Sequence, residues 1–155
     1  MPGIDSSIVE HEIKMYLDVK SVRQRLCPLH PKKAAAIKVE IEKLLHVGFI
    51  YPVPLTDWVS NLVPVMKKQG PIRVCVDYRD VNNSCPKENY PTPFIDQIID
   101  DCVGCEIISF MDGFSSYNQI NIRPEDQYKT NFICPWGTFA YRKLPFGLKN
   151  AGETF

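Results

Sequence analysis

Residues 109–120 read SFMDGFSSYNQI, and this stretch is the most informative part of the chain. The mostly apolar run from Glu106 to Met111 predicts a buried strand, so that Asp112 ends the strand beside Gly113. A carboxylate in that position is exposed on a rigid support, as metal-assisted chemistry requires. The alternative is that Asp112 is only a turn or helix-cap residue.

The composition is that of a globular domain, because 155 residues with 45% apolar side chains suffice for one core of ordinary size. The formal net charge is zero, but the charges are unevenly distributed. Seven Lys or Arg accompany two Glu between Lys20 and Lys43, whereas nine acidic residues accompany two basic ones between Asp80 and Asp126. This polarity favours a basic nucleic-acid face beside an acidic metal-binding floor, with ordinary solvated faces as the alternative.

Residues 1–30 are expected to form an extended connector, and residues 31–48 a helix that Pro31 opens and Gly48 ends. The apolar residues at helical spacing that should face the core are Ile37, Ile41, Leu44 and Leu45. Two prolines between Tyr51 and Asp57 predict a surface crossing.

Asn61 to Lys67 and Ile72 to Asp77 predict two strands of a hairpin. The hairpin and its flank carry the basic side chains Lys67, Lys68, Arg73 and Arg79. Such side chains suit a clamp for a triphosphate or a template backbone. The alternative is a sheet edge that lysines protect against aggregation.

Beyond a loop from Asn82 to Pro93, residues 94–103 predict a helix packed under a sheet, with Asp100 and Asp101 facing solvent. Further strands are expected at 119–122 paired with 129–133, and at 138–143. The fold class is therefore α+β, with a mostly antiparallel sheet and packed helices.

Five sequence segments follow one another along the chain. They are RVCVDYR at 73–79 with Asn82 after it, NYPTP at 89–93 with IDQ at 95–97, residues 109–120, KTNF at 129–132, and LPFGLKNA at 144–151. In this order and spacing they resemble the reverse transcriptase of gypsy-class LTR retrotransposons. The resemblance implies that residues 31–155 are the fingers and part of the palm of a right-hand RNA-directed DNA polymerase. Residues 1–30 resemble the linker between the protease and the polymerase of such a polyprotein.

The resemblance makes Asp112 the catalytic residue and a metal ligand, with the Gly113 carbonyl as a second metal contact. The complete family enzyme uses two Mg²⁺ ions for nucleotidyl transfer. The family's Tyr- or Phe-x-Asp-Asp hairpin is expected downstream of Phe155, so the chain looks truncated before the second catalytic motif. We expect the fragment alone to be inactive and to hold Mg²⁺ weakly.

Five residues match nucleotide-binding positions of the family. Lys67 and Arg73 match positions that hold the phosphates, and Phe146 and Gly147 match the segment that lines the nucleotide pocket. Tyr117 matches an aromatic gate that would clash with a ribose 2′-hydroxyl; a core tyrosine is the alternative.

Asp77 and Arg79 match template-contacting positions. The implied partners are an RNA or DNA template-primer and deoxynucleoside triphosphates, with the remaining palm, thumb and RNase H portions outside this chain. Two departures from the family pattern are Ser116, where a Gly is usual, and Glu153, where a small residue is usual.

The N-terminus shows no secretory signal, and no window approaches the roughly 18 apolar residues of a membrane span. We therefore expect an intracellular protein, cytoplasmic and within virus-like particles if the element is active, with its six cysteines reduced. The other functions left open are a residual nucleic-acid-binding module and a non-functional relic of a degenerate element.

Overall fold

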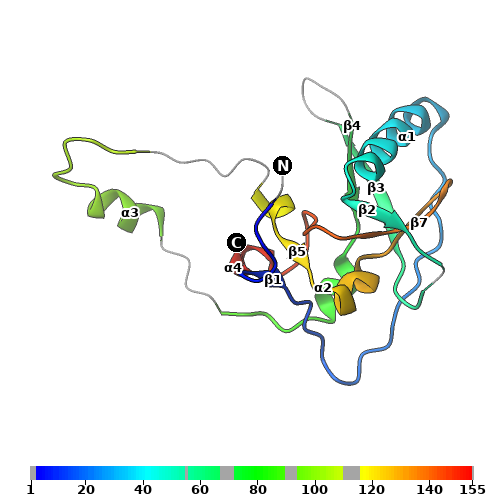
Figure 1. Ribbon diagram of the computed structural model, residues 1–155, viewed down its shortest axis with the longest axis horizontal. Coiled ribbons are helices and arrows are strands. Elements are labelled where there is room, and N and C mark those ends of the chain that lie inside the picture. The colour runs from blue at the N-terminus through cyan, green and yellow to red at the C-terminus, as the bar shows by residue number, and fades with distance from the viewer. Residues whose placement is uncertain (1–2, 55, 67–71, 90–93, 110–115, 155) are drawn as a thin grey trace.

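The computed structural model describes residues 3–54, 56–66, 72–89, 94–109 and 116–154. Figure 1 shows a main body that contains the sheet and α1 (Pro31–His46), with α3 (Ile95–Asp101) set apart from it. None of the helices in these ranges is long and apolar enough to cross a membrane.

The helix α1 forms where the sequence predicts it. Pro31 fits the first helical position because its missing N–H has no helical partner there. At the other end Gly48 has φ 72°, and the Phe49 amide donates to the Leu44 carbonyl at 3.0 Å. This is a left-handed helix stop, which glycine adopts without steric cost. Ile37 and Ile41 are fully buried on the face that packs against β4 (Ile72–Val76), as predicted.

The main sheet has five strands in the order β2-β7-β6-β3-β4. Only the β3–β6 pair is parallel, so the prediction of a mostly antiparallel sheet is confirmed. The strands other than β4 span Ile50–Pro52 (β2), Ser60–Met66 (β3), Phe132–Cys134 (β6) and Gly137–Tyr141 (β7).

The predicted hairpin is the β3–β4 pair, in which Leu62 lies opposite Val76 and Val65 opposite Arg73. Lys67 and Lys68 lie outside the described residues. The expected surface crossing was wrong at its start, because β2 pairs with β7 in register Tyr51 to Ala140. The burial of Ile50 explains this strand, since the side chain needs the sheet to cover it.

The N-terminal connector pairs with later segments of the chain. Its short strand β1 (Glu10–His11) pairs in parallel with β5 (Asn121–Ile122). Further along, the Gln24 amide donates to the Val59 carbonyl at 2.8 Å, and the Val59 amide donates to Val22 at 3.1 Å. The connector therefore shares backbone hydrogen bonds with the chain that follows it.

The predicted pairing of residues 119–122 with 129–133 was wrong. β5 pairs with β1 instead, and the Ile122 amide donates to the Arg142 carbonyl at 2.8 Å. Residues Pro124–Thr130 form a 3₁₀ helix, η2, which begins at a proline. Proline fixes a helical φ, so the chain turns there and continues into β6 without forming a hairpin back to β5.

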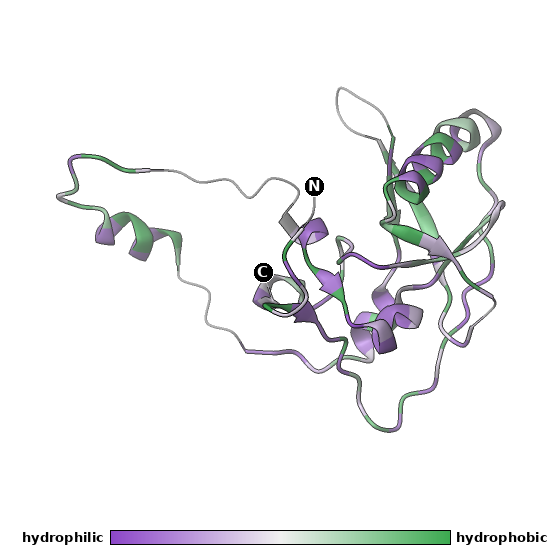
Figure 2. Cartoon of the chain, in the orientation of Figure 1, coloured by the Kyte–Doolittle hydropathy of each residue, from purple (hydrophilic) through white to green (hydrophobic). Residues whose placement is uncertain are grey.

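The helix predicted at 94–103 exists as α3, but it does not pack under the sheet. None of its residues is buried, and Phe94 and Ile95 are 79% and 75% exposed. Figure 2 shows its green apolar residues away from the main body. Asp100 and Asp101 are exposed, as predicted. Periodicity identified a helix but could not identify what its apolar face contacts.

The expected strand at 106–111 is absent from its described part, because residues 106–109 form no strand and are exposed. A strand forms only where another strand accepts its hydrogen bonds, and no described strand pairs with this segment. The expected loop at 82–93 begins inside a short helix, α2 (Arg79–Asn83).

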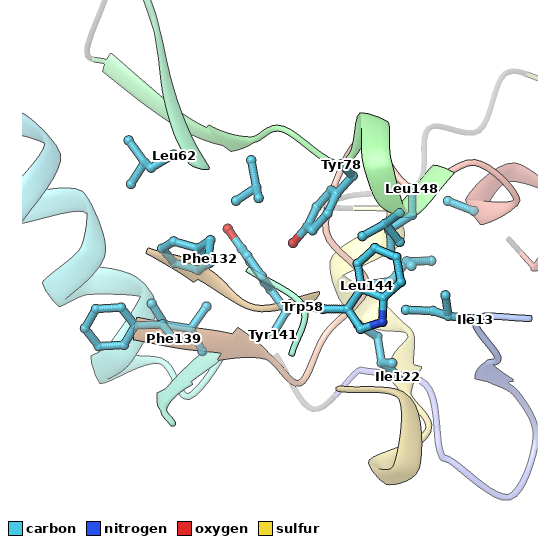
Figure 3. Close-up of a cluster of buried hydrophobic side chains, with 14 of the residues drawn as sticks. Ile13, Trp58, Leu62, Tyr78, Ile122, Phe132, Phe139, Tyr141, Leu144 and Leu148 are labelled. Atoms are coloured by element: carbon cyan, nitrogen blue, oxygen red, sulfur yellow. The ribbon is translucent and has the colours of Figure 1, made fainter. Parts of the chain in front are cut away.

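The core lies where the sheet meets the N-terminal connector and the C-terminal segment (Figure 3). Phe132 is fully buried, with ring centroids 5.8 Å from Phe139 and 5.5 Å from Tyr141. Ile13 from the connector and Leu144 from the C-terminal segment complete this cluster. The core therefore holds together segments that are distant in sequence.

Candidate functional site

A cavity of about 600 Å³ lies beside α1 and the β3–β4 hairpin. It brings together Arg73, Tyr117 and Phe146, three of the five predicted nucleotide-binding residues. We call it the hairpin cavity. Its remaining lining residues are Glu40, Leu44, Val65, Val74, Cys75, Val76, Asn118, Tyr141 and Pro145.

Arg73 supplies positive charge to the hairpin cavity. Its side chain is exposed on β4 and takes part in no ion pair within the described residues. An arginine without a carboxylate partner can bind a phosphate through two parallel hydrogen bonds. Glu40 of α1 lines the same cavity and gives it an acidic side.

Tyr117 and Phe146 form an aromatic wall of the hairpin cavity. Their ring centroids lie 6.3 Å apart at an interplanar angle of 55°, a tilted arrangement that aromatic rings prefer. Tyr117 belongs to the 3₁₀ helix η1 (Ser116–Gln119), and Phe146 is 76% exposed. Gly152 lies near the Tyr117 hydroxyl, since a Cβ added to it would be 3.9 Å from that oxygen, an ordinary van der Waals contact.

The segment after Phe146 is held by hydrogen bonds to α2 and its C-terminal flank. Gly147 has φ 106°, a conformation that residues with a side chain rarely adopt. Asn82 Nδ2 donates to the Gly147 carbonyl at 2.8 Å, and the Lys149 amide donates to Asn82 Oδ1 at 2.9 Å. Lys149 Nζ donates to the Cys85 carbonyl at 2.7 Å. The exposed Phe146 therefore lies at the start of a loop that these hydrogen bonds hold in place.

A second cavity, of about 620 Å³, contains the two predicted template-binding residues, Asp77 and Arg79. We call it the connector groove, because the connector forms one side of it. His30 and Lys33 also line it. Its other lining residues are Gln24, Cys27, Pro28, Leu29, Asn61, Leu62, Val63 and Pro64.

Asp77 orients Arg79 at the edge of the connector groove. Arg79 Nε donates to Asp77 Oδ1 at 2.8 Å and Nη2 to Oδ2 at 2.6 Å, while the Arg79 side chain stays 84% exposed. These hydrogen bonds hold the pKa of Asp77 below its usual value of 3.8. The guanidinium is thus fixed in direction and still open to solvent.

Three predicted site residues, Asp112, Gly113 and Lys67, lie outside the described residues. Within the described ranges no group of three or more His, Cys, Asp or Glu side chains could hold a metal ion. The carboxylate and carbonyl oxygens that Asp112 and Gly113 offer are hard ligands of the type that Mg²⁺ prefers.

The sequence interpretation missed several residues of these cavities. Glu40 and Leu44 belong to a helix interpreted only as core, and Tyr141 to a strand without an assigned role. Asn82 stood in a recognised segment, but its partners lie 65 and 67 residues further along the chain. No local pattern in the sequence reveals contacts over such separations.

Known proteins resemble this chain in both sequence and fold. The family model for reverse transcriptase (RNA-dependent DNA polymerase) matches residues 65–155. A Transposon Tf2-3 polyprotein of Schizosaccharomyces pombe is 33% identical over 150 residues, which cover 95% of this chain and 11% of that protein. The chain thus spans about a tenth of the length of the curated relatives it matches.

Foamy virus enzymes are among the solved structures that resemble the chain. Native prototype foamy virus protease-reverse transcriptase is 25% identical with a TM-score of 0.71, over 92% of this chain and 19% of that chain. A foamy viral protease-reverse transcriptase in complex with dsDNA shares the fold at 19% identity and a TM-score of 0.72, over 94% of this chain and 30% of that chain. The expected fold and the resemblance to a retrotransposon reverse transcriptase are confirmed. The chain belongs to the reverse transcriptase (RNA-dependent DNA polymerase) family.

Proposed function

We propose that this chain supplies the fingers and part of the palm to a retrotransposon polymerase that copies RNA into DNA. The observation that carries the proposal is the hairpin cavity, where Arg73, Tyr117 and Phe146 meet from three separate segments. The resemblance to the family implies nucleotide binding for each of them. Two kinds of protein support the proposal: similar transposon polyproteins, and foamy viral enzymes solved with dsDNA and with an RNA/DNA hybrid.

In this proposal Arg73 binds the triphosphate of the incoming nucleotide. Arg73 lies on a strand, which fixes the position of its backbone beside the cavity. Lys67 follows the partner strand β3 in the sequence and would add a second cation. Two cations on one hairpin offset much of the negative charge that a triphosphate brings.

Tyr117 would select the sugar. The Tyr117 ring packs against Phe146, which places it on one wall of the hairpin cavity. A ribonucleotide would therefore meet a steric clash that a deoxynucleotide avoids. Selection by exclusion needs a bulky group at the position of the 2′-hydroxyl, which Tyr117 would supply.

The template strand would lie along the connector groove. Arg79, oriented by Asp77, is placed to contact a phosphate or a base edge, with Lys33 adding a second positive charge to the groove. The β3–β4 hairpin lines both cavities, so one hairpin would contact both the nucleotide and the template.

Asp112 and the Gly113 carbonyl would hold Mg²⁺, which when bound stabilises charge on the attacking and leaving oxygens. The further carboxylates of such a site belong to the family's Asp-Asp hairpin. Copying is accordingly a property of the longer polypeptide. For the chain itself the proposal specifies binding of nucleotide and template.

Nucleotide binding can be tested by the fluorescence of a mant-labelled dGTP titrated with the chain in Mg²⁺. Arg73→Ala should weaken binding about tenfold or more, since a charged hydrogen bond contributes about 1.5–3 kcal/mol. Arg123→Ala is the matched control, because Arg123 is ion-paired to Glu12 at 2.9 Å and lines neither cavity. Equal affinities for the wild-type chain and Arg73→Ala would contradict the proposal.

A further inference from the structure

Asn82 uses both ends of its side-chain amide on the loop that follows Phe146. Nδ2 donates to the Gly147 carbonyl at 2.8 Å, and Oδ1 accepts from the Lys149 amide at 2.9 Å. Both partners are backbone groups, two residues apart, on either side of Leu148. An asparagine fits this arrangement because its amide offers a donor and an acceptor side by side.

The same loop is held from α2 and its flank by further contacts. Lys149 Nζ donates to the carbonyls of Asn82 at 3.2 Å and Cys85 at 2.7 Å. The ring of Tyr78, just before α2, lies 3.8 Å from the place that a Cβ on Gly147 would occupy. The loop is therefore held by α2 and by the residues on either side of it. Of these hydrogen bonds, the two from the Asn82 side chain are the ones to the backbone of Gly147 and Lys149.

The helix α2 also connects the two cavities. Arg79, its first residue, lines the connector groove, and Asn82 lies three residues later, about one helical turn. Phe146, next to Gly147, lines the hairpin cavity and packs on Tyr117. A displacement of Asn82 would thus displace Phe146 and, with it, a wall of the hairpin cavity.

We infer that Asn82 is a positioning residue. It fixes the Phe146–Lys149 loop so that Phe146 and Tyr117 together form a wall of the hairpin cavity. The inference rests on the proposed function in its second part, because it makes nucleotide affinity depend on Asn82. Its first part, that Asn82 orders the loop, stands without any nucleotide.

Two variants and one control separate these parts. Asn82→Ala removes both hydrogen bonds, whereas Asn82→Asp keeps an acceptor for the Lys149 amide and places a second oxygen against the Gly147 carbonyl. Asn83→Ala is the control: Asn83 is the next residue of α2, it is exposed, and its side chain makes no hydrogen bond within the described residues. Both alanine variants change helix propensity equally.

The first measurement is hydrogen exchange of the Lys149 amide by NMR in the 155-residue chain. We expect exchange at least about tenfold faster in Asn82→Ala than in Asn83→Ala, because alanine removes the acceptor of the Lys149 amide. Asn82→Asp keeps that acceptor but loses the donor to Gly147, so its exchange should lie between those of the two alanine variants. Exchange that is the same in Asn82→Ala and Asn83→Ala would overturn the inference.

The second measurement is the affinity for mant-dGTP in the same variants. Asn82→Ala should bind about tenfold more weakly than Asn83→Ala, which corresponds to about 1.4 kcal/mol. Fast exchange at Lys149 with unchanged nucleotide affinity would overturn the link between the loop and the cavity. If the wild-type chain binds no mant-dGTP, the proposed function fails, while the exchange data still decide whether Asn82 orders the loop.

Discussion

Asp126 and Lys129 form an ion pair, with the Lys129 Nζ 2.5 Å from Asp126 Oδ1, and their side chains are only 7% and 14% exposed. Both also bind the backbone of Ile13 in the connector. The Ile13 amide donates to Asp126 Oδ2 at 2.9 Å, and Lys129 Nζ donates to the Ile13 carbonyl at 2.7 Å. The connector is therefore tied to η2 by a buried pair of charges that uses the donor and the acceptor of one residue.

Asp126→Ala should lower the free energy of unfolding by about 3 kcal/mol, because removal of one partner leaves a buried, uncompensated charge on Lys129. Glu125→Ala, an exposed neighbour on η2, is the control and should change stability by less than about 0.5 kcal/mol. Urea denaturation followed by the fluorescence of the buried Trp58 measures both. Similar losses in the two variants would show that the pair does not hold the connector.

His11 should make the stability of the chain depend on pH. The side chain is buried, its Nδ1 lies 2.8 Å from the Thr154 hydroxyl, and burial lowers the pKa of His11 below its ordinary 6.5 against the opposing effect of the Asp126, Glu88 and Glu12 carboxylates. The unfolded chain thus binds the proton more readily than the folded chain. The contribution of His11 to stability is full above about pH 6.5 and is lost as the pH falls through the lowered pKa.

Unfolding measured between pH 7.5 and 5 tests this dependence. The wild-type free energy of unfolding should fall on acidification with an added slope of at most about 1.4 kcal/mol per pH unit, and His11→Gln should lose that added slope. The control is His46→Gln, since His46 is exposed at the end of α1. If His11→Gln and the wild-type chain show the same pH dependence, the buried imidazole is not its source.

Tyr117→Ala should remove the preference for deoxynucleotides. In the wild-type chain we expect dGTP to compete with mant-dGTP about tenfold better than GTP, a difference of about 1.4 kcal/mol. Without the phenol ring the two competitors should become nearly equal, because the clash with the 2′-hydroxyl is gone. Tyr128→Ala serves as the control, since Tyr128 is exposed on η2. A preference for dGTP that persists in Tyr117→Ala would assign sugar selection to another residue.

Arg79→Ala should weaken binding to an RNA/DNA hybrid and reduce the slope of log affinity against log salt by about one unit, the amount expected for a lost phosphate contact. Fluorescence anisotropy of a labelled hybrid at several salt concentrations gives both quantities. Arg123→Ala removes the same charge outside the connector groove and should leave the slope unchanged. Equal slopes in all three proteins would show that Arg79 does not bind the template.

Local sequence patterns predicted the elements whose shape depends on nearby residues. Helix α1 follows from its apolar spacing between Pro31 and Gly48, and the β3–β4 hairpin from two alternating runs close together. The prediction that α3 packs under the sheet was wrong. The helical spacing of its apolar residues is the same whether or not another element covers its apolar face. The pairing of β5 with β1 joins residues more than a hundred positions apart, which no local pattern specifies.

The candidate site shows the same division. Arg73, Tyr117 and Phe146 were predicted from short segments, and the structure places them around one cavity. Asn82 and Glu40 were missed as site residues because their roles depend on which distant segments fold against them. The family resemblance thus identified residues that the fold brings to one cavity, whereas the contacts that support them could be seen only in the fold.

Binding of a deoxynucleoside triphosphate in the hairpin cavity can be measured residue by residue, by NMR chemical-shift mapping of the isotope-labelled chain with dGTP and Mg²⁺. If the cavity is the nucleotide site, we expect saturable shifts at Arg73, Tyr117 and Phe146, with Arg123 and α3 unaffected. Shifts that are absent from these three residues, or that cluster in the connector groove instead, would contradict it.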